Sequence, residues 1–141
     1  MLAVRNLTRR QTPRRLFHQL TEKILGSEYE LSLVLVGRRR SRNLNRRYRG
    51  RDKATNVLSF RLEKNSGEMF VDLGQVAREA AREGQTFLNR LRLIFIHGLL
   101  HLKGLDHGSK MESLESQYEK NDRHRTRRWQ RHHARGRLRT R

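Results

Sequence analysis

Apolar and polar positions follow one another along the chain in an order that predicts strands and helices in turn. Leu2–Val4 and Leu31–Val36 are short apolar runs of the kind that form buried strands. Between them, apolar residues recur at helical spacing from Leu16 to Leu25. The pair Thr12-Pro13 predicts the helix start, with Thr12 as the N-cap and Pro13 as the first helical residue. The pattern therefore predicts a strand, a helix and a second strand.

The middle of the chain predicts a hairpin and two further helices. Thr55–Phe60 has the composition of a strand, Lys64–Gly67 that of a turn, and Glu68–Val71 that of the partner strand. Val76–Glu83 is rich in alanine and amphipathic, which predicts a short helix. Thr86 then stands at a position suited to cap another helix.

The helix after Thr86 is apolar on nearly every face, and a helix of that kind is buried. Its apolar residues are Leu88, Leu91, Ile94, Phe95, Leu99 and Leu100. A last amphipathic stretch, 111–121, predicts one more helix, with Leu114 and Tyr118 facing inward.

Composition and charge indicate one domain with a strongly basic surface. The chain has 141 residues, of which 34% are hydrophobic and 33% charged, so it is long enough for a single core. Its formal net charge of +19 favours a polyanionic partner, with nucleic acid as the first candidate. We place the domain at 1–122. The remainder, 123–141, has nine arginines and no acidic residue, and we interpret it as a basic tail that is disordered without a polyanion.

Several classes of protein and of site are excluded by what the sequence lacks. There is no cysteine, so neither a disulfide framework nor a thiolate metal site is possible. No apolar run approaches the roughly 18–20 residues that span a bilayer. Met1–Arg10 has no apolar segment of signal-peptide length. We therefore expect a cytoplasmic protein with no membrane partner.

A run of arginines between residues 38 and 53 carries the first chemical signal. Eight arginines and Lys53 are opposed there only by Asp52. Leu44 and Tyr48 are four residues apart, so a helix would bury a narrow stripe and present guanidinium groups elsewhere. Guanidinium forks match phosphate oxygens, which predicts contact with nucleic acid. The alternative is a solvated helix face, although such faces usually mix both signs of charge.

The stretch from His97 to His107 carries the second signal. His97 and His101 are four residues apart, so both imidazoles project from one face of a helix and can bind one ion. Gly104 permits a left-handed turn that brings His107 up as a third ligand. Three protein ligands with a position left for water are the pattern of a catalytic zinc, although histidine also suits nickel, copper or iron. The alternative is a set of purely structural histidines.

The spacing of these histidines is that of the metzincin proteases, with one large difference. Gly98 stands where those enzymes carry their general-base glutamate. A glycine cannot accept a proton, and a peptidase has no use for so high a positive charge. A zinc metallopeptidase is therefore the least favoured of the function classes that the motif allows.

Two blocks of the sequence resemble the YbeY endoribonuclease family. His97–His107 has the form H-G-x-x-H-L-x-G-x-D-H, and Leu44–Asp52 followed by Thr55–Phe60 is similar to the family's central block. The resemblance covers about residues 31–120. The chain departs from the pattern at Arg61, where a proline usually stands, and in its arginine-rich tail.

The resemblance implies an α+β fold, with a small mixed sheet of about four strands, about five helices, and a metal cleft beside the buried central helix. It implies one zinc ion per chain, Zn2+, on His97, His101 and His107. It also implies a single-strand-specific, metal-dependent endoribonuclease of ribosomal RNA maturation and ribosome quality control. The implied partners are RNA, in particular ribosomal RNA, and the small ribosomal subunit, and no DNA is expected.

Our hypothesis for the reaction is hydrolysis of RNA phosphodiesters by a zinc-bound water. The family's functional arginine falls on Arg49, which would meet the charge that develops on the phosphoryl group. Arg46, Arg47 and Arg51 would hold the flanking RNA backbone. Because Gly98 leaves the motif without a general base, attack by an RNA 2′-hydroxyl is an alternative. A second function class is a non-catalytic RNA-binding ribosome-assembly factor in which the metal is structural.

Overall fold

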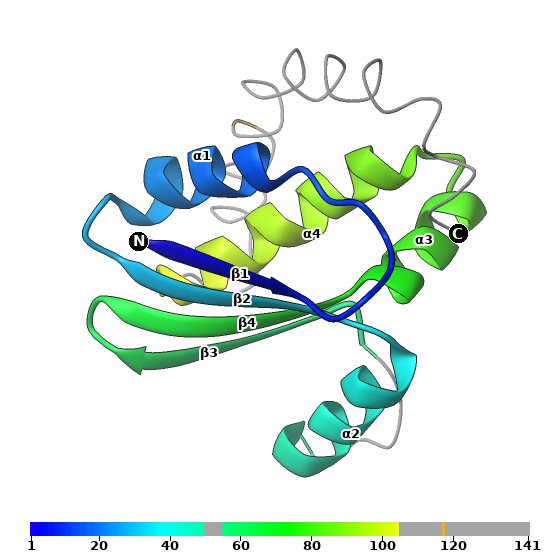
Figure 1. The fold of residues 1–141 in the computed structure, drawn as a ribbon, viewed down its shortest axis with the longest axis horizontal. Helices are drawn as coiled ribbons and strands as arrows, with labels where there is room; N and C mark the ends of the chain where they lie inside the picture. Colours follow the sequence, from blue (N-terminus) through cyan, green and yellow to red (C-terminus); the bar gives the residue numbers. More distant parts are fainter. Residues whose placement is uncertain (50–54, 105–116, 118–141) are drawn as a thin grey trace.

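A computed structural model describes residues 1–49, 55–104 and 117 of the chain. The described residues form four strands and four helices (Figure 1). In chain order they are β1 (Leu2–Asn6), α1 (Arg14–Leu25), β2 (Glu30–Val36), α2 (Arg38–Arg49), β3 (Val57–Glu63), β4 (Ser66–Asp72), α3 (Leu73–Arg82) and α4 (Phe87–Leu102). The α+β class is confirmed. The predicted fifth helix, 111–121, lies outside the described residues except for residue 117.

The strands form one mixed sheet in the order β1-β2-β4-β3. The pairs β1–β2 and β2–β4 are parallel, and β3–β4 is antiparallel, which confirms the predicted hairpin. Leu33 in the centre of β2 pairs with Val4 on one side and Met69 on the other. Both hairpin strands run further toward their turn than the sequence predicted.

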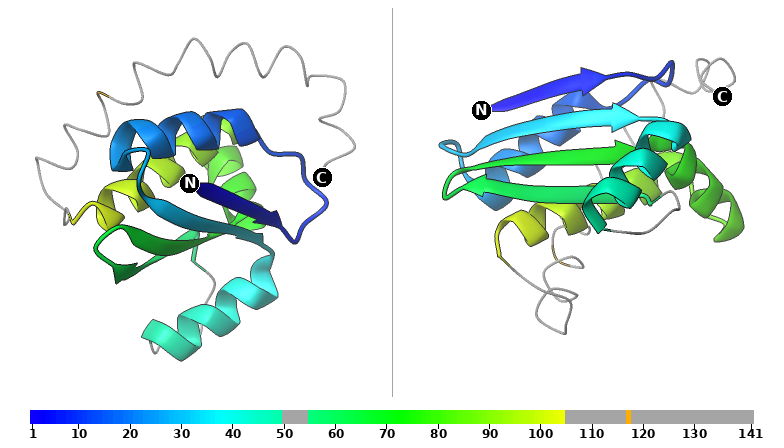
Figure 2. Two further views of the ribbon diagram at one scale, coloured as in Figure 1. Left: turned by 60° about the vertical axis from the view of Figure 1, so that its left-hand side comes forward. Right: turned by 90° about the horizontal axis from the view of Figure 1, so that it is seen from below.

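The helices lie on both sides of the sheet (Figures 1 and 2). Helices α1 and α4 cross one face, and α3 lies beside α4 at the end of the sheet where β2 and β4 finish. Helix α2 lies on the other side of the sheet. The core is formed where α1 and α4 meet the first face. There the rings of Phe17 and Phe95 have centroids 4.7 Å apart, and Leu33, Met69 and Leu91 are fully buried.

Helix α4 is the buried central helix that the sequence predicted. The side chain of Thr86 accepts a hydrogen bond from the Asn89 amide and so caps it. All six of the apolar residues expected inside are buried. Arg92 is also buried, with 1% of its surface exposed, and it bonds to Asn89, which the apolar pattern does not predict. The helix ends before Gly104, whose φ of 100° confirms the expected left-handed turn.

Two predicted helix starts differ from the structure, by one residue in α1 and by three residues in α3. Helix α1 begins at Arg14, with Pro13 at its cap position and no side-chain cap bond, so Thr12 does not serve as the cap. Helix α3 begins at Leu73 rather than Val76, because Asp72 caps it by accepting from the Gln75 amide at 3.0 Å. Asp72 is also the last residue of β4, so strand and helix meet there without a loop.

No helix within the described parts of the chain has the length and apolar character needed to cross a membrane.

Candidate metal centre and its cleft

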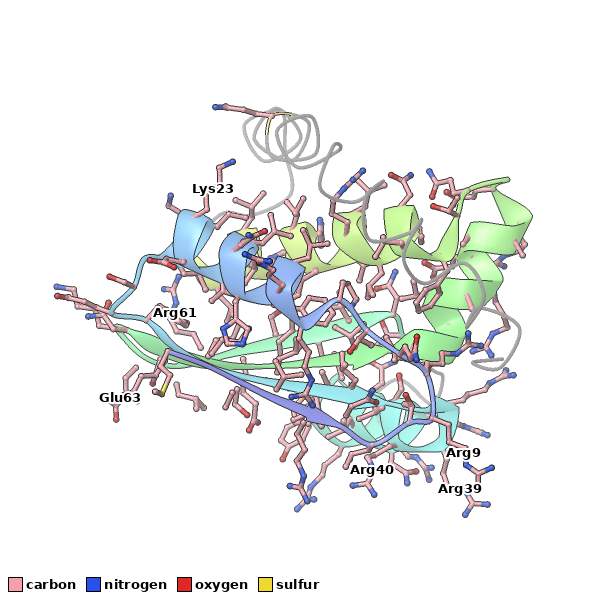
Figure 3. The ribbon with its side chains drawn as sticks, turned by 45° about the horizontal axis from the view of Figure 1, so that its top comes forward. Arg9, Lys23, Arg39, Arg40, Arg61 and Glu63 are labelled. Atoms are coloured by element: carbon pink, nitrogen blue, oxygen red, sulfur yellow. The ribbon has the colours of Figure 1, made fainter. Side chains whose placement is uncertain are left out.

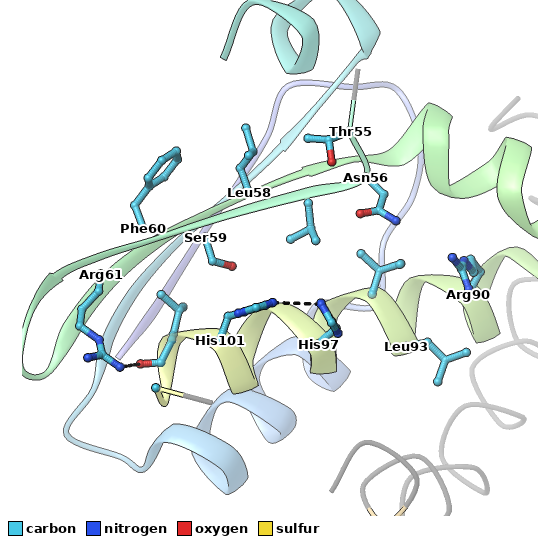
Figure 4. A pocket seen from close by; sticks show the side chains of 14 residues that line it. Thr55, Asn56, Leu58, Ser59, Phe60, Arg61, Arg90, Leu93, His97 and His101 are labelled. Carbon is cyan, nitrogen blue, oxygen red and sulfur yellow. Dashed lines mark hydrogen bonds between the residues drawn. The ribbon is translucent and has the colours of Figure 1, made fainter. Parts of the chain in front are cut away.

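A cleft of about 890 Å3 opens between β3 and α4, at the edge of the sheet (Figure 4). Strand β3 is the edge strand of the sheet, so no further strand covers the space between β3 and α4 on that side, and the cleft is open to solvent there. The cleft brings together imidazole, guanidinium, hydroxyl and amide groups. The polar side chains that line it include Asn56, Ser59, Arg61, Arg90, His97 and His101.

His97 and His101 lie together on the face of α4 that borders this cleft, as the spacing predicted (Figure 4). Their Nε2 atoms are 3.1 Å apart, and both side chains are half-buried. Two nitrogen ligands about 2.0–2.1 Å from one tetrahedral ion would be about 3.3 Å apart. The observed separation suits two ligands of a single ion, and equally a hydrogen bond between a protonated and an unprotonated ring nitrogen.

The third expected ligand, His107, lies outside the described residues. Within residues 1–49 and 55–104, no group of three or more His, Asp or Glu side chains is placed to hold a metal. The described part of the candidate centre therefore consists of two imidazoles and the cleft that they face.

Gly98 packs α4 directly against the sheet. A Cβ atom at this position would lie 2.7 Å from Met69 Cε and 3.2 Å from Ser59 Oγ, closer than atoms in van der Waals contact. The Ser59 hydroxyl donates to the Gly98 carbonyl at 3.2 Å and ties β3 to the helix. A glutamate at 98 would extend into the sheet and not into the cleft. This close approach gives a physical reason for the glycine.

Arg61 occupies the end of the cleft near the C-terminus of α4. Its Nη2 donates to the Leu102 carbonyl at 3.0 Å, where a cation also complements the helix dipole (Figure 4). Burial raises the pKa of Tyr29, and the positive charge of Arg61 opposes that rise. Arg61 stands where the resemblance led us to expect a proline, and it makes a defined contact at the cleft.

Arg90 and Asn56 line the other end of the cleft and are held by one carboxylate. Glu79 Oε1 accepts from Arg90 Nη2 at 3.0 Å and from Asn56 Nδ2 at 3.1 Å, and Gln75 bonds to the same carboxylate. Burial alone would raise the pKa of Glu79. The hydrogen bonds from Asn56, Gln75 and Arg90, together with the charge of Arg90, outweigh burial and hold that pKa below its usual value. This network fixes the polar wall of the cleft.

The arginines of α2 form a separate basic surface. A groove of about 630 Å3 on this helix is lined by Arg38, Arg39, Arg42, Asn43 and Arg46. Arg39 and Arg40 point away from the sheet (Figure 3). Arg46 and Arg47 are exposed, and none of the described α2 side chains lines the histidine cleft. Arg49 ends α2 without a described side chain, and Arg51 lies outside the described residues.

Among the cleft residues that were not predicted as site residues are four with polar side chains, Asn56, Ser59, Arg61 and Arg90. A signal for Arg90 was present in the sequence, since it stands seven residues before His97, two turns earlier on the same face of the helix. Ser59 and Arg61 alternate with Phe60 in β3, but the sequence does not say which of the two faces of the strand meets α4.

Comparison with known proteins connects this cleft to a family. The family model described as Endoribonuclease YbeY matches residues 4–127. An endoribonuclease YbeY from Aromatoleum aromaticum is 40% identical over 100 residues, which cover 65% of this chain and 65% of that protein. Another, from Geobacter metallireducens, is 32% identical over 138 residues, which cover 86% of this chain and 91% of that protein.

A solved structure agrees with the fold. The solution structure of TM1509 from Thermotoga maritima superimposes with a TM-score of 0.60 at 30% sequence identity, covering 83% of this chain and 87% of that one. The family match spans both the arginine-rich helix and the histidine-bearing helix. This chain belongs to the endoribonuclease YbeY family.

Proposed function

We propose that this protein is a metal-dependent endoribonuclease that hydrolyses phosphodiesters of single-stranded RNA in the cleft between β3 and α4. The observation that carries the proposal is the pair of imidazoles, His97 and His101, with Nε2 atoms 3.1 Å apart at the edge of an open cleft. The net charge of +19 supports a polyanionic substrate. The relatives that carry the name endoribonuclease support the same reaction class.

In this proposal His97, His101 and His107 hold one zinc ion. A bound zinc ion supplies two effects, a lowered pKa of coordinated water and polarisation of a phosphoryl oxygen. Arg49 meets the charge that develops on the phosphoryl group. Arg46, Arg47 and Arg51 contact the flanking phosphates through their guanidinium groups, whose forked N–H donors match phosphate oxygens.

In this proposal Glu79, which holds the polar wall of the cleft, does not act as the general base. Glu79 is held ionised by Arg90 and Asn56, and a carboxylate with a lowered pKa is a weak base. Gly98 has no side chain. Attack by an RNA 2′-hydroxyl therefore remains the alternative to attack by water. The two routes leave different product ends, because only 2′-hydroxyl attack gives a 2′,3′-cyclic phosphate.

We further propose that the substrate is ribosomal RNA, that the protein acts in ribosome maturation and quality control in the cytoplasm, and that it contacts the small ribosomal subunit. These assignments follow from the resemblance of the His97–His107 motif. They are consistent with a basic groove on α2 that suits a long polyanion.

One observation favours a second candidate, a non-catalytic RNA-binding assembly factor. The described arginines of α2 lie outside the histidine cleft, so RNA can bind them without reaching a metal. The packing of Gly98 against Met69 counts against a metallopeptidase, since no glutamate fits at that position.

The test compares His101→Ala with His18→Ala, which alters an exposed histidine on α1. Cleavage of an end-labelled single-stranded RNA and binding of the same RNA are measured on each protein. We expect the cleavage rate of His101→Ala to fall about 100-fold or more, with RNA affinity nearly unchanged. Loss of a residue that only hydrogen-bonds to a metal ligand costs about 10- to 100-fold in activity, and loss of a ligand itself should cost more. His18→Ala should behave as wild type. If the wild type binds RNA and none of the three cleaves it, the assembly-factor candidate is correct.

A further inference from the structure

The side of the sheet on which α2 lies carries a row of aromatic rings drawn from three elements. Tyr48 at the end of α2 meets Phe60 of β3 with ring centroids 5.1 Å apart, and Phe60 meets Phe70 of β4 at 6.0 Å. Both contacts are edge-to-face. Tyr48 is 56% exposed, and the two phenylalanines are half-buried. Part of each ring system is therefore accessible beside the helix.

The register of the hairpin places these rings on the face opposite the core. Ser59 pairs with Met69, and both face α4, whereas Phe60 and Phe70 occupy the alternate positions of their strands. In Figure 4, Phe60 points away from α4 while Ser59 points toward it. A sheet face that is open to water usually carries polar side chains. Aromatic rings at these positions are therefore candidates for binding.

Guanidinium groups flank the aromatic row on its α2 side. Helix α2 carries seven arginines and no acidic residue. The guanidinium carbon of Arg47 lies 5.7 Å from the centre of the Tyr48 ring, and the groove of Arg38, Arg39, Arg42 and Arg46 is on the same helix. Glu68 is the cross-strand partner of Phe60 and places one carboxylate beside that ring, and Glu63 lies further along β3 toward the hairpin turn. The charge gradient thus favours a polyanion on the α2 side.

We propose that Tyr48 and Phe60 form a stacking platform for bases of single-stranded RNA, with the arginines of α2 on its phosphates. Exposed aromatic rings beside a basic groove are the combination that proteins use to bind single strands without sequence preference. Duplex RNA is excluded, because its bases are stacked on one another and do not offer a free face. An apolar protein partner would not need the arginines.

The ring of Phe60 lies on the side of β3 away from α4, and residues of the same strand line the histidine cleft, so the platform and the cleft share the edge strand β3. A strand held on Tyr48 and Phe60 would pass over that edge toward His97 and His101. This continuity rests on the proposed function. The stacking platform itself does not, because binding can be measured without cleavage.

The experiment measures fluorescence anisotropy of a labelled oligouridylate of about 12 nucleotides, matched to single-strand sites of this kind. An abasic oligonucleotide of the same length serves as the second probe. All proteins carry His101→Ala, and a chelator is present, so that no RNA is cut. Tyr48→Leu and Phe60→Leu remove a ring and keep apolar volume, Tyr48→Phe restores the ring, and Leu7→Ala alters an exposed apolar residue beyond β1.

We expect Tyr48→Leu and Phe60→Leu each to weaken binding of oligouridylate about 5- to 100-fold and binding of the abasic probe less than about twofold. The salt dependence should stay unchanged, because no phosphate contact is lost. Tyr48→Phe and Leu7→Ala should bind as the parent does. Tyr48 is exposed, so its replacement does not disturb the core.

The platform is overturned if Tyr48→Leu binds oligouridylate as tightly as the parent, or if both probes weaken equally. If Tyr48→Leu binds oligouridylate as the parent does but no longer binds a protein that the parent binds, the rings serve an apolar protein partner, and the platform is overturned as well. The proposed function fails separately, if the protein without the His101 change binds RNA and does not cleave it.

Discussion

Gly98→Ala tests the packing that sets the cleft, because one added methyl group meets the sheet. The new Cβ would lie 2.7 Å from Met69 Cε, 2.9 Å from Met69 Sδ and 3.2 Å from Ser59 Oγ. Carbon atoms in good contact are about 3.5–4.0 Å apart, so Met69 or the helix must move by about 1 Å. Met69 is fully buried, and its neighbours leave it little room.

The expected cost follows from two opposing effects. Alanine in place of glycine inside a helix gains about 1 kcal/mol in helix propensity. Overpacking of a well-filled core costs about 1–3 kcal/mol. The overlap with Met69 places the overpacking cost in the upper part of that range, at about 2–3 kcal/mol. After the gain in helix propensity is subtracted, we expect Gly98→Ala to lower the free energy of unfolding by about 1–2 kcal/mol.

Gly74→Ala in α3 is the matched control. A Cβ there would meet its nearest neighbours, Arg78 Nη1 and Asp72 Oδ1, at 3.4 Å, which is ordinary contact. The same substitution should therefore stabilise the protein by up to about 1 kcal/mol. In a double-mutant cycle, Met69→Ala should cost less in the Gly98→Ala protein than in the wild type, because it removes the overlapping atoms.

The assay is urea unfolding followed by far-UV circular dichroism, with free energies extrapolated to water. The reasoning is wrong if Gly98→Ala is as stable as the wild type or more stable, while Gly74→Ala behaves as expected. It is also wrong if the effects of Gly98→Ala and Met69→Ala are additive.

Three further changes probe the ends of the cleft and the tail. Glu79→Gln should destabilise by about 1–2 kcal/mol at neutral pH, through the loss of charged hydrogen bonds. The pKa of Glu79 is lowered in the folded protein, so the stability difference between wild type and Glu79→Gln should shrink as the pH falls below 4.5, the ordinary pKa of a glutamate, and through the folded pKa. Urea titrations at several pH values would detect this change. Arg61→Met should cost about 0.5–1 kcal/mol of unfolding free energy, since α4 loses its bond at the Leu102 carbonyl. Deleting 123–141 should flatten the salt dependence of RNA binding, and an unchanged slope would show that this segment does not contact RNA.

The sequence predicted those parts of the fold that local pattern controls. The strands β1, β2 and the hairpin follow from apolar runs separated by turn residues, and α4 follows from apolar residues on every face. The start of α3 was missed because Asp72 ends a strand and caps a helix at once, so no loop residue marks the boundary. Buried Arg92 was missed because arginine is almost never fully buried, so the apolar pattern does not mark it as an inside residue.

The candidate site was predictable only where one helix defines it. Four-residue spacing alone brings His97 and His101 together, and the structure places them on one cleft wall. The placement of Ser59 and Arg61 on the opposite wall depends on the register of β3 against β4, which the sequence does not specify. Gly98 was interpreted as a missing base, and its contact with Met69 now gives it a structural reason.

The central claim is that cleavage of RNA depends on one metal ion held by the histidine motif. The most direct measurement is a titration of chelator-treated protein with Zn2+, in which cleavage of single-stranded RNA is followed against the ratio of zinc to chain. We predict that chelation abolishes cleavage, and that activity rises linearly and levels off at about one ion per chain. The same titration of His101→Ala should show no recovery. Cleavage that survives chelation, or that returns equally in His101→Ala, would contradict the account.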